Sequence, residues 1–172
     1  MDEENPICVM DTSEGQMRLE LFKKSAPETV DNFIKYAEND FYSGTIFHRI
    51  IEGFMIQGGG LTEEMSEKET PYEPIKNEAE ESGHRNERGT IAMARTSDPD
   101  SATSQFFINL EDNRRLDWDE AADGHGYCVF GEVIDGMDVV DKIGAVETVK
   151  KEGRENVPVE DIKIKKVEIE DQ

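Results

Sequence analysis

The sequence has few of the residues that build covalent or metal frameworks. It contains two cysteines, Cys8 and Cys128, which lie far apart and form no C-x-x-C pair. Two such thiols give neither a disulfide framework nor a zinc knuckle, so we expect both to be buried. The three histidines also lack the spacing of zinc ligands. We therefore expect no metal site and no cofactor.

Long apolar runs are missing as well. No run approaches the roughly 18 apolar residues that cross a membrane, and the N-terminal residues lack the basic-then-apolar order of a secretory signal. Hydrophobic residues still make up 35% of the 172 residues, which suits one domain with one core. We expect a single domain over residues 1–172, no membrane contact and a cytoplasmic location.

Positive charge is scarce. The chain has 19 Lys+Arg against 40 Asp+Glu, which gives a formal net charge of −21 at pH 7. This balance argues against nucleic acid as a partner, because phosphates are bound by clustered cations. Regularly spaced hydrophobic runs argue against a disordered acidic chain. We expect a folded body with a solvated acidic surface, and the alternative is a dedicated site for a basic partner.

The chain also lacks the short motifs of several enzyme classes. It has no G-x-G-x-x-G, no G-x-x-x-x-G-K-[ST], no H-E-x-x-H and no G-x-S-x-G. Paired carboxylates carry no information about glycosidase chemistry here, because acidic residues are abundant throughout. The glycines at 58–60 could cradle a phosphate, but neither lysine nor serine follows them directly.

Apolar periodicity predicts two hairpins in the first third of the chain. The first pairs residues 7–11 with residues 16–21 across the sequence TSEG. The second pairs residues 45–51 with residues 54–57, and Glu52-Gly53 forms a two-residue turn whose glycine supplies a positive φ.

Two helices are predicted from apolar spacing and end signals. The first lies within residues 25–40, with Ser25 and Glu28 as a capping box and Pro27 in the first turn. The second lies within residues 135–144 and closes at its final glycine.

The rest of the chain supplies further strands. Residues 61–88 show no clear period and are expected to be irregular. Three short apolar runs follow, and a final run at 157–169 alternates with a change of phase that predicts a bulge near Lys165-Lys166. Eight candidate strands and two helices predict a mainly β fold, a closed eight-stranded antiparallel β-barrel capped by two α-helices. No exposed apolar stripe is evident, so we expect a monomer.

Four blocks carry a resemblance to a known family. FHRIIEGFMIQGGG sets one cation, Arg49, among hydrophobes, and GTIAMAR, SQFFINL and GYCVFGEVIDGMDVVD follow it. Taken alone, these blocks read as core residues and one surface arginine. In this order and spacing they resemble the signature of the cyclophilin family of peptidyl-prolyl cis/trans isomerases over nearly the whole chain. MIQGGG and Tyr127 resemble the bacterial and archaeal type most.

The resemblance implies an enzyme that isomerises X–Pro peptide bonds and assists protein folding. Its partners would be proline-containing peptides and unfolded protein clients. Arg49 matches the catalytic arginine, and Gln57 matches the glutamine that orients it. Arginine keeps its charge at ordinary pH, so positioned electrostatics describes its role better than proton transfer.

The resemblance also implies a substrate site with apolar walls and a polar edge. Phe54, Met55, Phe107 and Leu116 match the walls of a proline pocket that would hold the ring and lower the local dielectric. The remaining matches are Ala94 and Arg95, whose backbone would pair with the substrate chain, Gln105, a polar contact beside it, and Tyr127, where many eukaryotic members have histidine.

Two positions depart from the family pattern. Arg115 stands where many eukaryotic members have tryptophan, and Trp118 follows three residues later. We therefore expect cyclosporin to bind weakly. Arg95 replaces a frequent asparagine, which should alter peptide preference more than catalysis. A proline-peptide binding chaperone module with incidental catalysis remains the alternative, and a rate assay on prolyl peptides separates it from an enzyme.

The acidic excess is spread along the whole chain, and in this it resembles proteins from salt-accumulating halophilic microbes. An acidic chain from a mesophile is the alternative. At a net charge of −21 the compact chain repels itself more than the unfolded chain does, so low ionic strength opposes folding. Salt relieves this, because the Debye length falls from about 10 Å at 0.1 M to about 3 Å at 1 M.

We predict that the urea midpoint of unfolding and the activity both rise as potassium chloride increases from about 0.1 M to about 1 M. Urea titrations followed by circular dichroism, beside rate assays in the same buffers, measure this. A further gain above about 1 M would indicate ion binding or stronger apolar burial in addition to screening. A midpoint that stays level or falls removes the halophile hypothesis.

Overall fold

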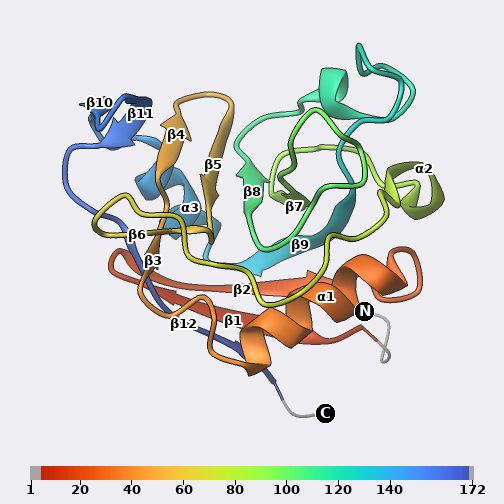
Figure 1. Ribbon diagram of the computed structural model, residues 1–172, viewed down its shortest axis with the longest axis horizontal. Coiled ribbons are helices and arrows are strands. Elements are labelled where there is room, and N and C mark those ends of the chain that lie inside the picture. The colour runs from red at the N-terminus through yellow and green to blue at the C-terminus, as the bar shows by residue number, and fades with distance from the viewer. Residues whose placement is uncertain (1–4, 171–172) are drawn as a thin grey trace.

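A curled antiparallel sheet dominates the computed structural model, which describes residues 5–170 (Figure 1). The sheet has ten strands in the order β4-β5-β8-β7-β9-β2-β1-β12-β3-β6. These strands are β1 (Ile7–Thr12), β2 (Gly15–Leu21), β3 (Thr45–Ile46), β4 (Arg49–Ile51), β5 (Met55–Gly58), β6 (Leu61–Thr62), β7 (Thr90–Met93), β8 (Phe106–Asn109), β9 (Val129–Asp135) and β12 (Lys163–Ile169).

Helices and one separate ribbon complete the described chain. The helices are α1 (Pro27–Glu38), α2 (Ala79–Ser82), α3 (Met137–Gly144) and the 3-10 turn η1 (Arg114–Leu116). The ribbon pairs β10 (Thr148–Lys151) with β11 (Arg154–Pro158). Helix α1 packs against β12, and α3 packs against β2 and β5. Of the helices in residues 5–170, none has both the length and the apolar character needed to cross a membrane.

The expectation of a closed eight-stranded barrel is not confirmed. The sheet is open, since it runs from β4 to β6 and no ladder joins those two strands within the described residues. The reason lies at residues 45–51, which were expected to form one strand. They form two, because β3 pairs with β12 and β6 while β4 pairs with β5. The hydrogen-bonded ladder is interrupted at this point, where the chain passes from β3 to β4.

The first hairpin and the bulge in the last strand are both confirmed. Strands β1 and β2 pair antiparallel, with Thr12 opposite Gly15. Between β1 and β12, Asp11 pairs with Lys166 and Thr12 pairs with Ile164, so Lys165 has no partner in that ladder. A bulge of this kind changes the side-chain phase by one residue. It therefore lets Ile164 and Val167 both point into the core, where they are 0% and 3% exposed.

The second hairpin has a longer turn than predicted. Ile51 pairs with Met55, so the loop contains three residues, Glu52, Gly53 and Phe54, instead of the expected two. The Phe54 N–H donates to the Ile51 carbonyl at 3.0 Å, and Gly53 has φ 73°. Three-residue hairpin loops with glycine in the left-handed region are common. As a consequence Phe54 lies outside the ladder.

The first helix is confirmed, but its predicted capping box is wrong. The N-cap residue is Ala26, with no side-chain cap, and the Ser25 hydroxyl lies 3.2 Å from a ring nitrogen of His84. Glu78 caps the helix instead, because its Oε1 accepts from both the N–H and the hydroxyl of Thr29, each at 2.7 Å. A carboxylate at a helix N-terminus also complements the helix dipole.

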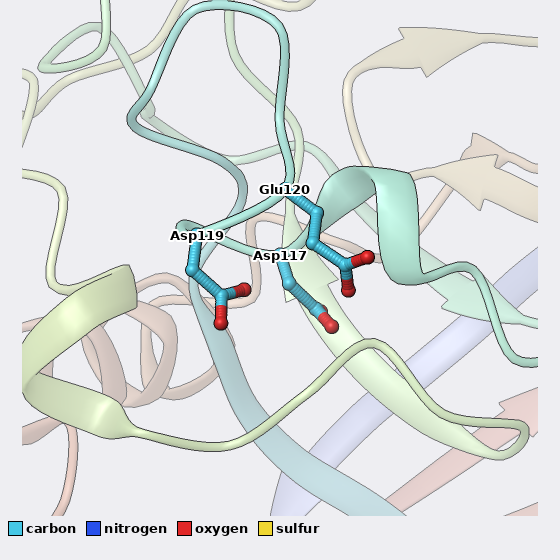
Figure 2. Close-up of side chains that lie close together, drawn as sticks. All are labelled: Asp117, Asp119 and Glu120. Atoms are coloured by element: carbon cyan, nitrogen blue, oxygen red, sulfur yellow. The ribbon is translucent and has the colours of Figure 1, made fainter.

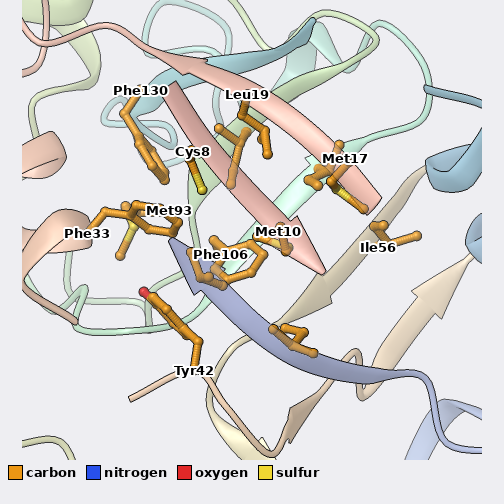
Figure 3. Packing of buried hydrophobic residues seen from close by; sticks show 14 of the residues in the cluster. Cys8, Met10, Met17, Leu19, Phe33, Tyr42, Ile56, Met93, Phe106 and Phe130 are labelled. Carbon is orange, nitrogen blue, oxygen red and sulfur yellow. The ribbon is translucent and has the colours of Figure 1, made fainter. Parts of the chain in front are cut away.

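The main core fills the space between the sheet and the two longer helices. Figure 3 shows aromatic rings of Phe33, Phe106 and Phe130 packed with sulfur side chains of β1, β2 and β7. The Phe33 and Phe130 ring centroids are 5.2 Å apart. Both cysteines are buried and free, as expected. Burial raises the pKa of the Cys128 thiol to about 12.

A second, smaller apolar cluster lies on the other face of part of the sheet. Side chains alternate between the faces of a strand, so in β8 Phe106 joins the main core and Phe107 joins this second cluster. The cluster contains Phe22, Met55, Ala92, Ala94, Phe107 and Val129, with Ile51, Phe54, Leu116 and Tyr127 packed against it. This second cluster forms the base of the candidate site.

Candidate functional site

Strand register sets Arg49 beside a run of apolar side chains. Arg49 of β4 pairs with Gln57 of β5, Gln57 pairs with Phe107 of β8, and Phe107 pairs with Ala92 of β7. Directly paired residues of antiparallel strands place their side chains on the same face. The four strands therefore present a guanidinium, an amide, a phenyl ring and a methyl group in one row.

Three members of this row, Arg49, Gln57 and Phe107, border a cavity of about 160 Å³. Nine of the ten site residues expected from the sequence line it: Arg49, Phe54, Met55, Gln57, Ala94, Arg95, Phe107, Leu116 and Tyr127. The tenth, Gln105, lines a neighbouring cavity of about 150 Å³ that shares Gln57, Ala94 and Arg95 with the first. The structure thus gathers residues spread from 49 to 127 around two adjoining hollows.

A chain of side-chain hydrogen bonds holds the guanidinium at the cavity edge. Arg49 Nη1 donates to Gln57 Oε1 at 3.3 Å, and Gln57 Nε2 donates to Gln105 Oε1 at 3.1 Å. Gln57 uses its carbonyl toward Arg49 and its amide nitrogen toward Gln105, so its orientation is fixed. Arg49 itself is exposed, and its guanidinium forms no ion pair with any carboxylate of residues 5–170.

Aromatic contacts form one wall of the cavity. The rings of Phe107 and Tyr127 meet edge to face with centroids 5.6 Å apart. The guanidinium of Arg95 lies 4.4 Å from the centroid of the Tyr127 ring. Such contacts fix the ring planes, because a cation over a ring face and an edge-to-face pair both have preferred geometries. The two contacts therefore set the orientation of the Tyr127 ring in this wall.

The Arg95 side chain is bound within the protein. It is 4% exposed, and Nη2 lies 2.7 Å from Asp123 Oδ2 while Nε donates to the Gly126 carbonyl at 3.1 Å. Backbone N–H of His125 and the Arg95 guanidinium together hold the pKa of Asp123 well below its usual range. Arg95 therefore supports the wall through Tyr127 and the 123–126 loop, and its charge is already neutralised.

The 94–95 segment and Gln105 are also joined through the backbone. The Ala94 N–H donates to the Gln105 carbonyl at 3.0 Å, so that donor is used within the protein. Ala94 is 9% exposed. The segment thus forms a fixed border between the two hollows.

A buried polar network, which the sequence did not reveal, holds the opposite wall. Asp117 is fully buried, and its Oδ1 accepts from the N–H and from the side-chain amide of Asn86 at 2.7 and 3.1 Å. Asn113 donates to the Phe54 carbonyl at 2.8 Å and to Asn109 Oδ1 at 2.9 Å. Buried polar groups are stable when they are paired in this way. The network fixes the loop that carries Phe54 and the turn that carries Leu116.

Asp117 also belongs to a group of three carboxylates, with Asp119 and Glu120 (Figure 2). Arg85 supplies the positive charge of this group. Its Nη1 lies 3.1 Å from Asp117 Oδ2, its Nη2 lies 2.9 Å from Asp119 Oδ2, and Glu120 is 3.8 Å away. Hydrogen bonding to Arg85 lowers the pKa of Asp119. The group therefore acts as an ion-pair anchor beneath η1.

Comparison with known proteins agrees with this geometry. The model of the family "Cyclophilin type peptidyl-prolyl cis-trans isomerase/CLD" matches residues 7–169. Peptidyl-prolyl cis-trans isomerase B of Escherichia coli K12 is 54% identical over 159 residues, which cover 92% of this chain and 96% of that protein. The cyp18 isomerase of Streptomyces antibioticus is 50% identical over 161 residues, covering 93% and 96%.

Solved structures of a cyclophilin type isomerase have the same fold as this chain. The crystal structure of a cyclophilin type peptidyl-prolyl cis-trans isomerase of Cryptosporidium parvum superposes with a TM-score of 0.79 at 25% identity, and the match covers 98% of this chain and 99% of that one. A second structure of that protein was determined in the presence of the dipeptide Ala-Pro, with a TM-score of 0.78 and 26% identity over 96% and 99% of the two chains. The chain therefore belongs to the cyclophilin family and is a peptidyl-prolyl cis–trans isomerase.

Proposed function

We propose that catalysis is centred on Arg49. Rotation about an X–Pro bond breaks amide resonance, and the uncatalysed barrier is about 18 to 20 kcal/mol. In the twisted transition state the proline nitrogen becomes pyramidal and regains a lone pair, so a fixed donor stabilises it more than it stabilises the planar ground state. The observation that supports this role is the guanidinium of Arg49, held by Gln57 at the edge of an apolar cavity.

We also propose what the site binds. The cavity, with walls from Phe54, Met55, Phe107 and Leu116, would take the pyrrolidine ring of a proline-containing peptide, and the related C. parvum protein was studied with Ala-Pro. Unfolded proteins with exposed X–Pro bonds are the proposed clients, and assistance to folding in the cytoplasm is the proposed role. The protein is proposed to act as a monomer.

Replacing Arg49 tests the mechanism. Arg49→Ala is expected to lower kcat/KM by about 10² to 10³, the effect of losing one preorganised transition-state donor. Arg49→Lys should also be poor, because lysine keeps the charge but loses the planar fork. Magnetisation-exchange NMR on a prolyl peptide measures the rate, and Arg18→Ala, at an arginine outside the cavity, is the control.

Two results would contradict this proposal. In the first, Arg49→Ala is folded and keeps more than half of the wild-type rate, which means that the donor lies elsewhere. Alternatively, the wild-type chain binds prolyl peptides without accelerating their exchange, which is the behaviour of a binding module. Circular dichroism and the urea midpoint establish that each variant is folded before its rate is compared.

The pH dependence tests whether an acid or base takes part. His48, which precedes Arg49, is 4% exposed, and burial, with smaller effects of Arg154 and Arg49, lowers its pKa to about 4. Because its folded-state pKa lies below the unfolded value, the unfolded chain takes up a proton first, and His48 lowers stability as pH falls from about 6.5 toward 4. It stays neutral at higher pH.

We therefore predict that kcat/KM is nearly flat from about pH 6 to about pH 8.5, since no titrating group is used. The urea midpoint of unfolding should decrease as the pH is lowered from about 6.5. NMR exchange is the suitable assay, because it needs no coupled protease with its own pH profile. A bell-shaped profile centred near pH 7 in a fully folded sample would instead show that an acid or base participates.

Cyclosporin should inhibit weakly. Arg115 replaces a tryptophan of many eukaryotic members, and its guanidinium lies 4.9 Å from the centroid of the Phe54 ring. Trp118 is proposed not to substitute for that indole, and the contact of its ring with Arg85, 5.0 Å from ring centroid to guanidinium carbon, supports this. We predict that Arg115→Trp strengthens inhibition, measured as the cyclosporin concentration that halves the rate. Unchanged inhibition would mean that the alignment of residues 114–118 with the family is wrong.

A further inference from the structure

The arginines of this acidic chain are unevenly paired. Five of the eight form ion pairs with carboxylates: Arg18, Arg85, Arg88, Arg95 and Arg154. Three form none with residues 5–170: Arg49, Arg114 and Arg115. In a chain with 40 acidic residues, an arginine without a carboxylate is unexpected. Arg49 belongs to β4, and Arg114 and Arg115 belong to η1. Both elements contribute a residue to the lining of the cavity of about 160 Å³.

The three differ in their surroundings. Asp119, whose pKa is lowered mainly by its hydrogen bond with Arg85, also feels the charge of Arg114, so Arg114 lies near the carboxylate group of Asp117, Asp119 and Glu120. Arg49 is engaged by Gln57 and has the proposed catalytic role. Arg115 is exposed, and its guanidinium carbon lies over the face of the Phe54 ring, 4.9 Å from the ring centroid. That ring lines the cavity, so Arg115 is a free cation at the cavity rim.

Arg115 lies at the opposite end of the cavity from the 94–95 segment. Along the β5–β8 ladder, Met55 pairs with Asn109 at one end and Gly58 pairs with Phe106 at the other. Phe54 and Arg115 adjoin the first end, while Gln105, bonded to Ala94, adjoins the second. Three residues of strand separate these ends, which is about 10 Å. That distance is the span of about three extended peptide residues.

A peptide in the cavity would therefore meet the two ends with different parts of its chain. A peptide whose residues before proline pair with the backbone of Ala94 and Arg95 has its residues after proline beside Phe54 and Arg115, and we take this direction as part of the inference. Arg95 offers no charge to the peptide, since Asp123 neutralises it. The free charge at the exit is that of Arg115.

We propose that Arg115 is a specificity-determining residue that selects peptides with a carboxylate side chain, aspartate or glutamate, directly after proline. This inference rests on the proposed function and adds the substrate class that the site prefers. The stacking on Phe54 holds the planar guanidinium over the rim, where it can form a bidentate pair with an incoming carboxylate.

The overall charge of the protein opposes the binding of acidic peptides. At a net charge of −21 the protein as a whole repels acidic peptides and attracts basic ones, so any preference for glutamate must come from local cations. An exposed ion pair of this kind corresponds to a two- to fivefold effect on kcat/KM, roughly. Salt screens exposed pairs, and the preference should fade at about 1 M potassium chloride.

The test uses three peptides, Ac-Ala-Ala-Pro-Xaa-Ala-NH2, with glutamate, glutamine or lysine as Xaa. Exchange NMR on the full chain gives kcat/KM for each without a sequence-specific protease. We expect the glutamate peptide to exceed the glutamine peptide by about two- to fivefold, and lysine to be the poorest. In Arg115→Gln the glutamate-to-glutamine ratio should fall to about one. In the matched control Arg114→Gln, which removes the same charge from the neighbouring position, the ratio should persist.

A second series moves the glutamate to the position before proline. At that position we expect the Arg115→Gln substitution to leave the glutamate-to-glutamine ratio of kcat/KM unchanged. Equal rates for all three original peptides overturn the inference, and so does a glutamate preference that survives in Arg115→Gln or is lost equally in Arg114→Gln. These results leave the proposed mechanism intact, because every peptide is still isomerised. Failure of the wild-type chain to accelerate any of the peptides would instead remove the proposed function, and this inference with it.

Discussion

The pairing of β5 with a strand on each side is the constraint on which the site depends. Its ladder with β4 sets Gln57 opposite Arg49, and its ladder with β8 sets Gln57 opposite Phe107. A slip of one residue in either ladder would exchange the two faces of the strand. Ile56, now fully buried in the main core, would then face the cavity, and Gln57 would be buried without partners. The main core therefore fixes the register that aligns the guanidinium with the apolar row.

The sheet makes only half of the cavity, and loops make the other half. The loop half is rigid because its polar groups are buried and paired. Asp117 accepts three hydrogen bonds from Asn86 and Arg85, and Asn113 ties the Phe54 carbonyl to the same network. A fully buried carboxylate is costly without such partners. The position of Leu116 and Phe54 thus depends on hydrogen bonds among residues that never face the cavity.

Local patterns in the sequence predicted local structure well. The first hairpin, both longer helices and the bulge at Lys165 follow from periodicity within a few residues, and the structure confirms them. Features that depend on distant partners were not predictable in the same way. The capping box at Ser25 is a local pattern, but Glu78 provides the cap from 49 residues away. The open sheet likewise depends on which strands accept β3 and β4, which no local pattern specifies.

Some residues of the candidate site could be predicted from the sequence, and others could not. Long signature blocks carried the resemblance, and the residues transferred through it meet at one cavity and its neighbour. The buried asparagines and Asp117 gave no signal, because such residues are usually exposed in turns and their spacing has no period. The Phe54 loop was expected to be shorter by one residue, since a glutamate-glycine pair fits either turn length.

The cap that Glu78 provides also sets an order of events during synthesis. Helix α1 begins at Pro27, yet the acceptor for its Thr29 N–H lies in the chain beyond the second hairpin. A ribosome adds about 5 to 20 residues per second, so the segment that contains residue 78 is made several seconds after the helix. During that interval the N–H and the hydroxyl of Thr29 lack the Glu78 carboxylate. The segment between 61 and 88 has little regular structure of its own, yet it supplies the cap of α1, the helix that is synthesised first.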